Sequence, residues 1–236
     1  MINKALLKEM CLEHNVDLNA EQLQKLDEFS EILVEWNKKI NLTAIISPNE
    51  IVYKHFIDSL LIFRAIDLKF NSCLIDVGAG AGFPSTPIAI ARSDLFVTQL
   101  DSLKKRVSFL QTVNSRFGLN SRSIHGRAEE FARKIEYREK FDYVTARAVA
   151  SMDKLSEYCL PFAKVGGFFI AMKGPEYASE LEKAAKAIKV LGGRIEKVQI
   201  FKLENSSVRT IILVKKISQT PAKYPRTFVK ISKNPI

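Results

Sequence analysis

Apolar side chains recur every three or four residues in the first third of the chain, which is the spacing of one face of an α-helix. One such face comprises Leu23, Leu26, Phe29, Leu33, Trp36 and Ile40. The segment 47–50 (Ser-Pro-Asn-Glu) then supplies an N-cap, a proline at the first helical position and a capping-box glutamate, so another helix is predicted after it. We expect residues 1–65 to form a helical extension.

From residue 72 onward, short apolar runs alternate with helical segments. Strands are predicted at 73–78, 95–101, 123–126, 141–149, 166–173, 197–203 and 208–216. Helices are predicted at 87–92, 102–119, 152–160 and 175–191. Strands that are separated by helices pair in parallel, with helices on both faces of the sheet. A polar turn joins the last two strands and leaves no room for a helix, so we expect those two strands to pair antiparallel.

The pattern predicts an α/β chain in three parts. Residues 66–217 are expected to form a Rossmann-like domain with a mostly parallel sheet and an antiparallel last strand, behind the extension 1–65. Residues 218–236 contain three prolines and little periodicity. We expect this segment to be a basic arm rather than an element of the core.

Positive charge is concentrated in two segments of the chain, which has a formal net charge of +10. Residues 102–134 hold eight basic and two acidic residues, and residues 215–236 hold six basic residues and no acidic one, whereas residues 1–36 are net acidic. Clustered cations favour a nucleic-acid partner, because their contacts with phosphates release condensed counterions. The alternative is a basic surface that is merely solvated.

Cysteine usage and the N-terminal sequence bear on the compartment. Cys11, Cys73 and Cys159 are odd in number and far apart, so they suggest no disulfide framework. Glu9 and Glu13 interrupt the N-terminal segment, which is unlike a signal peptide. No apolar run approaches the roughly 20 residues that a membrane span needs. We expect a cytoplasmic, monomeric protein that is not associated with a membrane.

A glycine-rich turn follows the first predicted strand and reads Asp-Val-Gly-Ala-Gly-Ala-Gly over 76–82. Such a turn in an α/β sheet is a ligand site by topology. The dinucleotide fingerprint G-x-G-x-x-G does not fit, because its third glycine falls on Phe83 or Ser85, and a P-loop lysine is missing. The turn instead resembles motif I of the class I S-adenosylmethionine-dependent methyltransferases.

The resemblance assigns parts of the cofactor to particular residues. Gly78, Gly80 and Gly82 let the backbone approach the methionine end, whose carboxylate backbone N–H groups can bind. The Asp76 carboxylate can attract the ammonium group. A plain turn with surplus glycines is the alternative.

Two later positions suit the nucleoside end of the same cofactor. Asp101 ends the next strand, where a carboxylate can bind the ribose hydroxyls, although a residue that favours a helix N-terminus is the alternative. Ala128 and Glu129 follow the third strand, where adenine is expected to lie, and a solvated loop is the alternative there.

The loop after the fourth strand reads Thr-Ala-Arg-Ala-Val-Ala-Ser over 145–151 and lacks the Asn/Asp-Pro-Pro-aromatic motif of adenine amino-methylating enzymes. Cys159 lies in an apolar helical pattern, which favours a packed thiol over a nucleophile. The three histidines are scattered, and no metal-ligand spacing is present. A ring nitrogen with a free lone pair, such as guanine N7, needs none of these devices, because it has no proton to lose.

A more specific resemblance rests on segments that follow in order over most of the chain. They are WNKKINLTAI (36–45), HFIDSL (55–60), DVGAGAGFPSTPIAI (76–90), LDSLKKRVSFL (100–110), GRAEEF (126–131), TARAVA (145–150) and KYPR (223–226). On these segments the chain resembles the RsmG (GidB) family of bacterial 16S rRNA guanine-N7 methyltransferases. The resemblance implies methylation of guanine 527 in the 530 loop, with the small ribosomal subunit as partner. It also implies cofactor contacts from Gly78, Phe83, Ala128, Glu129 and Arg147.

Three residues are candidates for the catalytic machinery. Arg147 follows the fourth strand, and its planar guanidinium can bind a phosphate or the cofactor carboxylate but cannot act as a base. His55 and Asp58 lie three residues apart on one face of a predicted helix and can hydrogen-bond each other. A surface arginine and a purely structural pair are the alternatives.

Candidate RNA contacts come from cations outside the glycine turn. They are Lys104, Lys105, Arg106, Lys173, Lys223 and Arg226. The tail after Arg226 departs from the more glycine-containing sequence that the family leads us to expect. The resemblance therefore supports roles for residues 227–233 less than it supports roles for residues 224–226. Two other functions stay open: a methyltransferase acting on a small molecule or protein, and an RNA-binding module that holds the cofactor without turnover.

Overall fold

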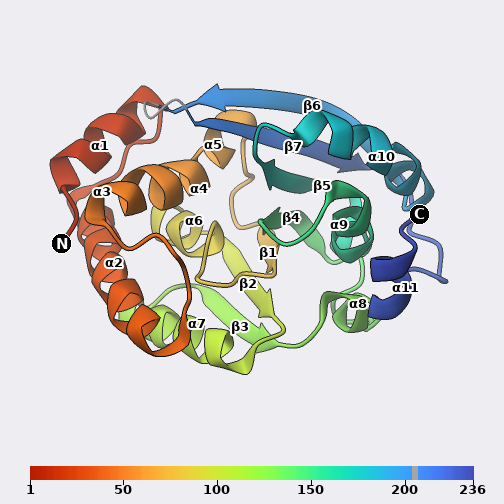
Figure 1. Cartoon of the computed structure of the whole chain (residues 1–236), viewed down its shortest axis with the longest axis horizontal. Coiled ribbons are helices and arrows are strands. Elements are labelled where there is room, and N and C mark those ends of the chain that lie inside the picture. The colour runs from red at the N-terminus through yellow and green to blue at the C-terminus, as the bar shows by residue number, and fades with distance from the viewer. Residues whose placement is uncertain (204–206) are drawn as a thin grey trace.

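A computed structural model of the chain describes residues 1–203 and 207–236. The described residues form a seven-stranded sheet between two layers of helices (Figure 1). The strand order is β3 (Ser121–His125), β2 (Phe96–Asp101), β1 (Cys73–Val77), β4 (Phe141–Arg147), β5 (Ala163–Lys173), β7 (Val208–Lys216) and β6 (Gly193–Lys202).

The sheet has the predicted strand directions. Strands β1 to β5 pair in parallel, and β7 pairs antiparallel with both β5 and β6. The α/β class and the antiparallel last strand are therefore confirmed. The polar turn predicted before β7 falls mostly on residues 204–206, which lie outside the described residues.

Alternate side chains of each strand serve two apolar cores, one on each face of the sheet. In β1, Leu74 belongs to the core on one face and Ile75 to the core on the other. The Leu74 face is covered by α1 (Lys4–Glu13), α2 (Ala20–Ile40), α3 (Pro48–Ile51), η1 (Val52–Ile57), α4 (Asp58–Leu60), α5 (Ile62–Ala65), α6 (Ser85–Ala91) and α7 (Lys104–Phe117). The Ile75 face is covered by α8 (Ala128–Phe131), α9 (Met152–Cys159), η2 (Leu160–Phe162), α10 (Tyr177–Val190) and α11 (Phe228–Lys233).

Local sequence explains where the helices of the extension begin. Asn19 and Gln22 form a reciprocal capping box at the start of α2. Ser47 caps α3 as predicted, and its hydroxyl accepts a hydrogen bond from the backbone N–H of Glu50. The helix predicted after residue 50 is not a regular α-helix throughout, because Val52–Ile57 form a π-helical turn. Single π-turns occur inside helices near functional sites, and they change which side chains share a face.

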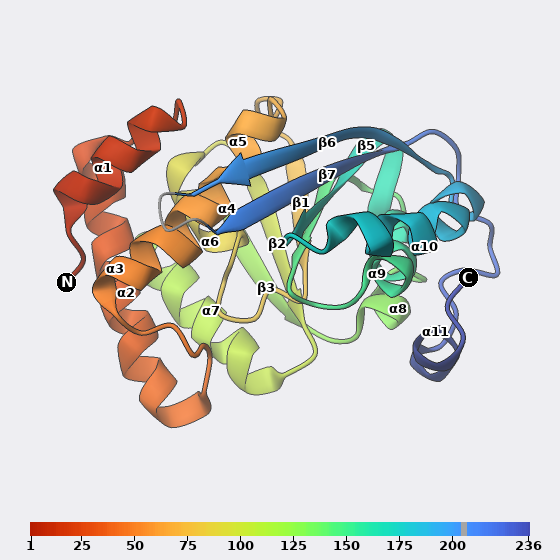
Figure 2. The same ribbon diagram turned by 45° about the horizontal axis from the view of Figure 1, so that its top comes forward.

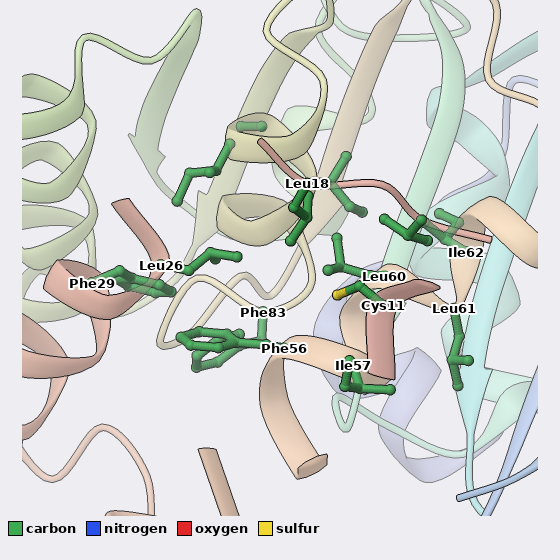
Figure 3. Packing of buried hydrophobic residues seen from close by; sticks show 14 of the residues in the cluster. Cys11, Leu18, Leu26, Phe29, Phe56, Ile57, Leu60, Leu61, Ile62 and Phe83 are labelled. Carbon is green, nitrogen blue, oxygen red and sulfur yellow. The ribbon is translucent and has the colours of Figure 1, made fainter. Parts of the chain in front are cut away.

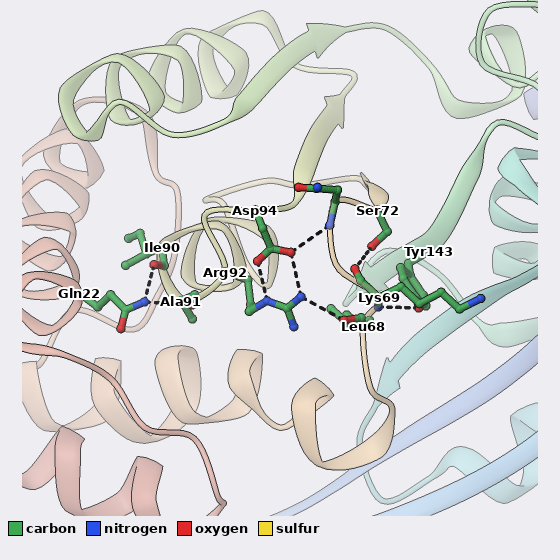
Figure 4. Close-up of polar contacts among 10 residues, drawn as sticks. Gln22, Leu68, Lys69, Ser72, Ile90, Ala91, Arg92, Asp94 and Tyr143 are labelled. Atoms are coloured by element: carbon green, nitrogen blue, oxygen red, sulfur yellow. Dashed lines mark hydrogen bonds and ion pairs between the residues drawn. The ribbon is translucent and has the colours of Figure 1, made fainter.

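The extension packs directly on the Rossmann-like part. The side-chain amide of Gln22 donates to the carbonyl oxygens of Ile90 and Ala91 at the end of α6, at 3.2 and 2.9 Å (Figure 4). Nearby, Arg92 binds Asp94 through two hydrogen bonds and also donates to the carbonyl oxygen of Leu68, at 3.0 Å. The hydrogen bonds of Gln22 span the predicted boundary at residue 65.

Aromatic rings continue the same attachment inside the protein. The Phe83 ring lies 5.3 Å from that of Phe29 and 6.1 Å from that of Phe56, measured between centroids (Figure 3). One buried apolar cluster therefore runs from the extension into the sheet domain. The division at residues 65 and 66 stays a prediction, and it does not separate two cores.

The tail differs from the arm that its prolines led us to expect. Residues 228–233 form α11, which lies beside α8 and α9 (Figure 2). Ile231 of this helix is fully buried in the core of the Ile75 face. The prediction that the tail stays outside the core is wrong, because Ile231 of α11 packs into that core. The prolines of the tail give no indication of this packing.

Candidate active site

The glycine turn after β1 is fixed to the end of β2. The backbone N–H groups of Gly78 and Ala79 both donate to the carbonyl oxygen of Leu100, at 2.8 and 3.1 Å. Gly78 and Gly82 have φ values of +76° and +86°, which strain any residue with a Cβ atom. An added Cβ at Gly78 would also lie 2.7 Å from a methyl group of Val149, so this position needs glycine for space as well.

A hollow of about 380 Å³, which we call the first hollow, opens beside this turn over the carboxyl ends of β1, β2 and β3. It is lined by four of the predicted cofactor-binding residues, Gly78, Asp101, Ala128 and Glu129. Burial raises the pKa of the Glu129 carboxyl above its ordinary value. A concave site of this size is typical for a cofactor.

Asp101 also holds the backbone around the first hollow in place. Its carboxylate accepts hydrogen bonds from the backbone N–H groups of Gly80 and Leu103, each at 2.8 Å. Arg106 lies 3.7 Å from the same carboxylate. Asp101 therefore braces the glycine turn against the start of α7 while it lines the hollow.

Two other predicted cofactor residues, Asp76 and Phe83, are buried and do not line the first hollow. Asp76 is fully buried, and its carboxylate accepts hydrogen bonds from the backbone N–H of Ser85 and the hydroxyl of Thr145, each at 3.3 Å. This burial raises the pKa of Asp76 to about 6. Phe83 is buried in the aromatic cluster of the Leu74 face. Roles for these two side chains toward the cofactor stay predictions.

A second hollow, of about 420 Å³, lies over the ends of β4 and β5 and the start of β7. It brings together Arg147, His55, Asp58 and Lys173, which were predicted separately. Arg209 from β7 also lines it and binds Asp58, with Nε 3.2 Å from the carboxylate. No local pattern singles out Arg209, since it sits inside an ordinary strand pattern.

Arg147 is the centre of a polar network that joins β4 to the extension. One terminal nitrogen donates to the Asp58 carboxylate at 2.6 Å and to the backbone carbonyl of Lys54 at 3.1 Å. The other terminal nitrogen lies 3.2 Å from Nδ1 of His55. His55 and Asp58, which their spacing would allow to hydrogen-bond each other directly, are instead bridged by Arg147.

His55 is held as a neutral imidazole by its partners. A guanidinium can only donate, so Nδ1 must accept from Arg147 and Nε2 must carry the proton. Nε2 then donates to the hydroxyl of Thr43, at 3.0 Å. Burial, with the adjacent Arg147 charge, lowers the pKa of His55 to about 3. The ring also stacks on Phe83 at 4.2 Å between centroids, so both nitrogens and one ring face are engaged.

The two hollows meet at the segment that follows β4. Ala148 lines the second hollow, and the next residue, Val149, lines the first. Ala148 has a φ of +56°, a conformation that a residue with a Cβ seldom adopts. The sheet order also reverses here, because β1 leads to β2 and β3 on one side while β4 leads to β5 and β7 on the other.

Comparison with known proteins identifies the family. The family model described as "GidB: rRNA small subunit methyltransferase G" matches residues 22–210. A ribosomal RNA small subunit methyltransferase G from Clostridium beijerinckii is 51% identical over 233 residues, covering 98% of each chain. The protein of the same name from Desulforamulus reducens is 47% identical over 98% of this chain and 97% of its own. This chain belongs to the GidB family.

Solved structures support the class of fold. The crystal structure of M. jannaschii TYW2 in complex with AdoMet superposes with a TM-score of 0.51 and 17% sequence identity, covering 63% of this chain and 71% of that one. The chain thus has the class I methyltransferase fold.

Cys159 and the metal-ligating side chains bear on two of the expected chemistries. Cys159 is fully buried, and burial raises the pKa of its thiol well above the ordinary value, which confirms the expected packed thiol. Across residues 1–203 and 207–236, the structure groups no three metal-ligating side chains. Within those same residues, the helices are too short or too polar to cross a membrane.

Five of the six predicted RNA contacts fall into two groups. Lys104, Lys105 and Lys223 are exposed. By contrast, the Lys173 ammonium lies 2.6 Å from Glu180, and the Arg226 guanidinium binds the buried carboxylate of Glu157 at 2.7 Å. The last two side chains hold protein elements together, a use that their sequence contexts do not reveal.

The neutral His55 gives a pH dependence of stability. Its pKa is about 3 in the folded protein and about 6.5 in the unfolded chain, so the unfolded state binds more protons between these values. The contribution of His55 to stability is present above pH 6.5 and is lost as the pH falls toward 3. Relative to the His55→Gln variant, the wild type should lose up to about 1.4 kcal/mol per pH unit in urea denaturation between pH 6 and 4.

The comparison with His55→Gln is needed because Asp76 acts in the opposite direction. The pKa of Asp76 is raised to about 6 in the folded protein, so its contribution to stability is fully present below the pKa that Asp76 has in the unfolded chain. That contribution is lost as the pH rises through 6. In the wild type alone the two slopes offset each other. Parallel pH curves for the two proteins would contradict the neutral, buried His55.

Proposed function

We propose that this enzyme methylates N7 of guanine 527 in the 530 loop of 16S rRNA, with S-adenosyl-L-methionine as the methyl donor. The observation that carries the proposal is the pair of hollows on either side of residues 147–150, at the point where the strand order reverses. In open α/β sheets, ligands bind at such a switch point, outside the carboxyl ends of the strands. Membership of the GidB family supports the methyl transfer and the RNA substrate.

The first hollow suits the cofactor. Gly78 has no Cβ, so its backbone stays accessible at a point where a Cβ would collide with Val149. This accessible backbone suits the methionine end of the cofactor. Asp101 and Glu129 offer carboxylate oxygens to the ribose and adenine, and Tyr158 adds an aromatic surface. When bound, the cofactor supplies an electrophilic methyl group. The residues of the first hollow would hold it, with Val149 and Ala150 of the segment after β4 among the lining.

The second hollow suits the acceptor base, which must leave its stack to reach the site. N7 of guanine has a free lone pair, so the protein removes no proton from it. A neutral His55 with both ring nitrogens occupied is consistent with that chemistry. Glu176 and Glu180 also line this hollow, and the Glu180 carboxylate is paired there with the Lys173 ammonium.

Arg147 positions the base rather than exchanging protons with it. Its guanidinium is fixed by Asp58, His55 and the Lys54 carbonyl, and only 14% of its side chain is exposed. It thereby fixes the wall between the two hollows. Lys104, Lys105 and Lys223 supply sequence-independent contacts with phosphates, which should weaken as salt rises.

The test uses ribosomal RNA from cells that lack this protein, both as naked RNA and as small subunits. Each is incubated with the enzyme and labelled S-adenosylmethionine, and N7-methylguanine is mapped by borohydride–aniline cleavage. We expect one cleavage, in the 530 loop. Methyl incorporation at another nucleotide or atom, or none in either RNA form while the cofactor binds, would overturn the proposed substrate.

A further inference from the structure

The C-terminal helix α11 forms part of the wall of the first hollow. Phe228 and Ser232, one turn apart on the same face of α11, both line the hollow. The Phe228 side chain is 46% exposed, although it is a large apolar group. Neither the family motifs nor the proposed cofactor contacts include it.

This wall is anchored on both sides of Phe228. After it, Ile231 is fully buried in the core of the Ile75 face. Before it, the backbone N–H of Arg226 donates to the buried Glu157 carboxylate at 2.6 Å, and the guanidinium adds three further hydrogen bonds to that carboxylate. Arg138 also binds the carbonyl oxygens of Tyr224 and Thr220, at 2.8 and 2.7 Å. The position of the Phe228 ring is therefore set by the fold.

Arg127 pairs with this ring. Its guanidinium carbon lies 4.7 Å from the centroid of Phe228, a cation–π contact, and Arg127 lines the first hollow as well. Arg127 directly precedes Ala128 and Glu129, which mark the adenine end of the hollow. Phe228 thus stands at the end of the hollow away from Gly78.

We infer that Phe228 stacks on the adenine ring of the cofactor and, with Arg127 holding the phenyl ring, determines the affinity of the enzyme for that end of the ligand. The inference rests on the proposed placement of S-adenosylmethionine in the first hollow. A purine that enters between Asp101 and Ala128 buries the exposed phenyl face, and stacking of a base on an aromatic ring is favourable irrespective of polar contacts. The tail of the chain is thereby part of the cofactor site.

The experiment measures the affinity for S-adenosylhomocysteine by isothermal titration calorimetry. We expect Phe228→Ala to weaken binding about 10-fold, and Phe228→Trp, which keeps an aromatic face, to bind within about threefold of the wild type. Val229→Ala is the matched control, because Val229 is the next residue of α11, is 57% exposed and does not line the hollow. It should bind like the wild type.

A second readout separates stacking from a structural effect. In steady-state assays, Phe228→Ala should raise the KM for S-adenosylmethionine about 10-fold and leave kcat within about twofold. Hydrogen exchange of the wild type should slow at the α11 amides when S-adenosylhomocysteine binds. Equal affinities of the wild type and Phe228→Ala, or a loss of RNA affinity without loss of cofactor affinity, would overturn the inference alone. A wild type that binds no S-adenosylhomocysteine would overturn the proposed cofactor as well.

Discussion

Replacing Arg147 with alanine is expected to lower kcat/KM for methyl transfer to the small-subunit RNA by at least about 100-fold. The change removes the guanidinium that ties β4 to Asp58, His55 and the Lys54 carbonyl. The wall between the two hollows then loses its fixed position, and misplacement of reacting atoms by about 1 Å costs rates of this order. The measurement is the initial rate of incorporation of labelled methyl groups at saturating cofactor.

Arg92→Ala is the matched control for this prediction. Arg92 also binds an aspartate and a backbone carbonyl, those of Asp94 and Leu68, but it lies outside both hollows. It should keep kcat/KM within about threefold of the wild type. Arg147→Lys should recover little activity, because an ammonium group cannot reproduce the planar fork. Full activity of Arg147→Ala would contradict the claim that Arg147 fixes the wall between the two hollows.

Gly82→Ala is expected to lower the free energy of unfolding by about 3 kcal/mol. At a φ of +86° a Cβ is strained, and the added atom would lie 2.5 Å from the Thr86 hydroxyl and 3.1 Å from a methyl group of Leu110. The strain and the collision act together, because the turn is packed against α6 and α7 at this point. Urea denaturation at pH 7, with the midpoint and m-value compared, measures the change.

Gly80→Ala separates backbone strain from collision within the same turn. Gly80 also has a positive φ, +57°, but the nearest atom to its added Cβ is 3.8 Å away. Its expected loss is about 1 kcal/mol, from the left-handed conformation alone. Equal losses for the two variants would mean that close packing on α6 and α7 does not explain the glycine at 82.

Local patterns in the sequence were sufficient to predict the sheet and the first hollow. Strand β7 and its antiparallel pairing with β6 followed from a short linker. Gly78 and Asp101 could be placed together because parallel strands end at one edge of the sheet. Each of these inferences depends on neighbours in sequence or on a general topological rule.

Contacts between distant segments could not be read from the sequence. The bridge from Arg147 to His55 joins β4 to a π-turn some ninety positions earlier, and helical spacing alone does not reveal that Arg147 links His55 to Asp58. Phe228 looked like part of a loose tail, because the buried site for Ile231 exists only once α9 is in place. Tertiary packing, rather than local preference, decides such positions.

The division of labour between the two hollows is tested most directly by a crystal structure of the enzyme with S-adenosylhomocysteine. The account predicts the homocysteine end at Gly78, the ribose at Asp101, the adenine between Ala128 and Phe228, and the sulfur directed toward Ala148. The second hollow should stay open to the acceptor base. The ligand bound in the second hollow, or with its sulfur turned away from residues 147–150, would contradict the account.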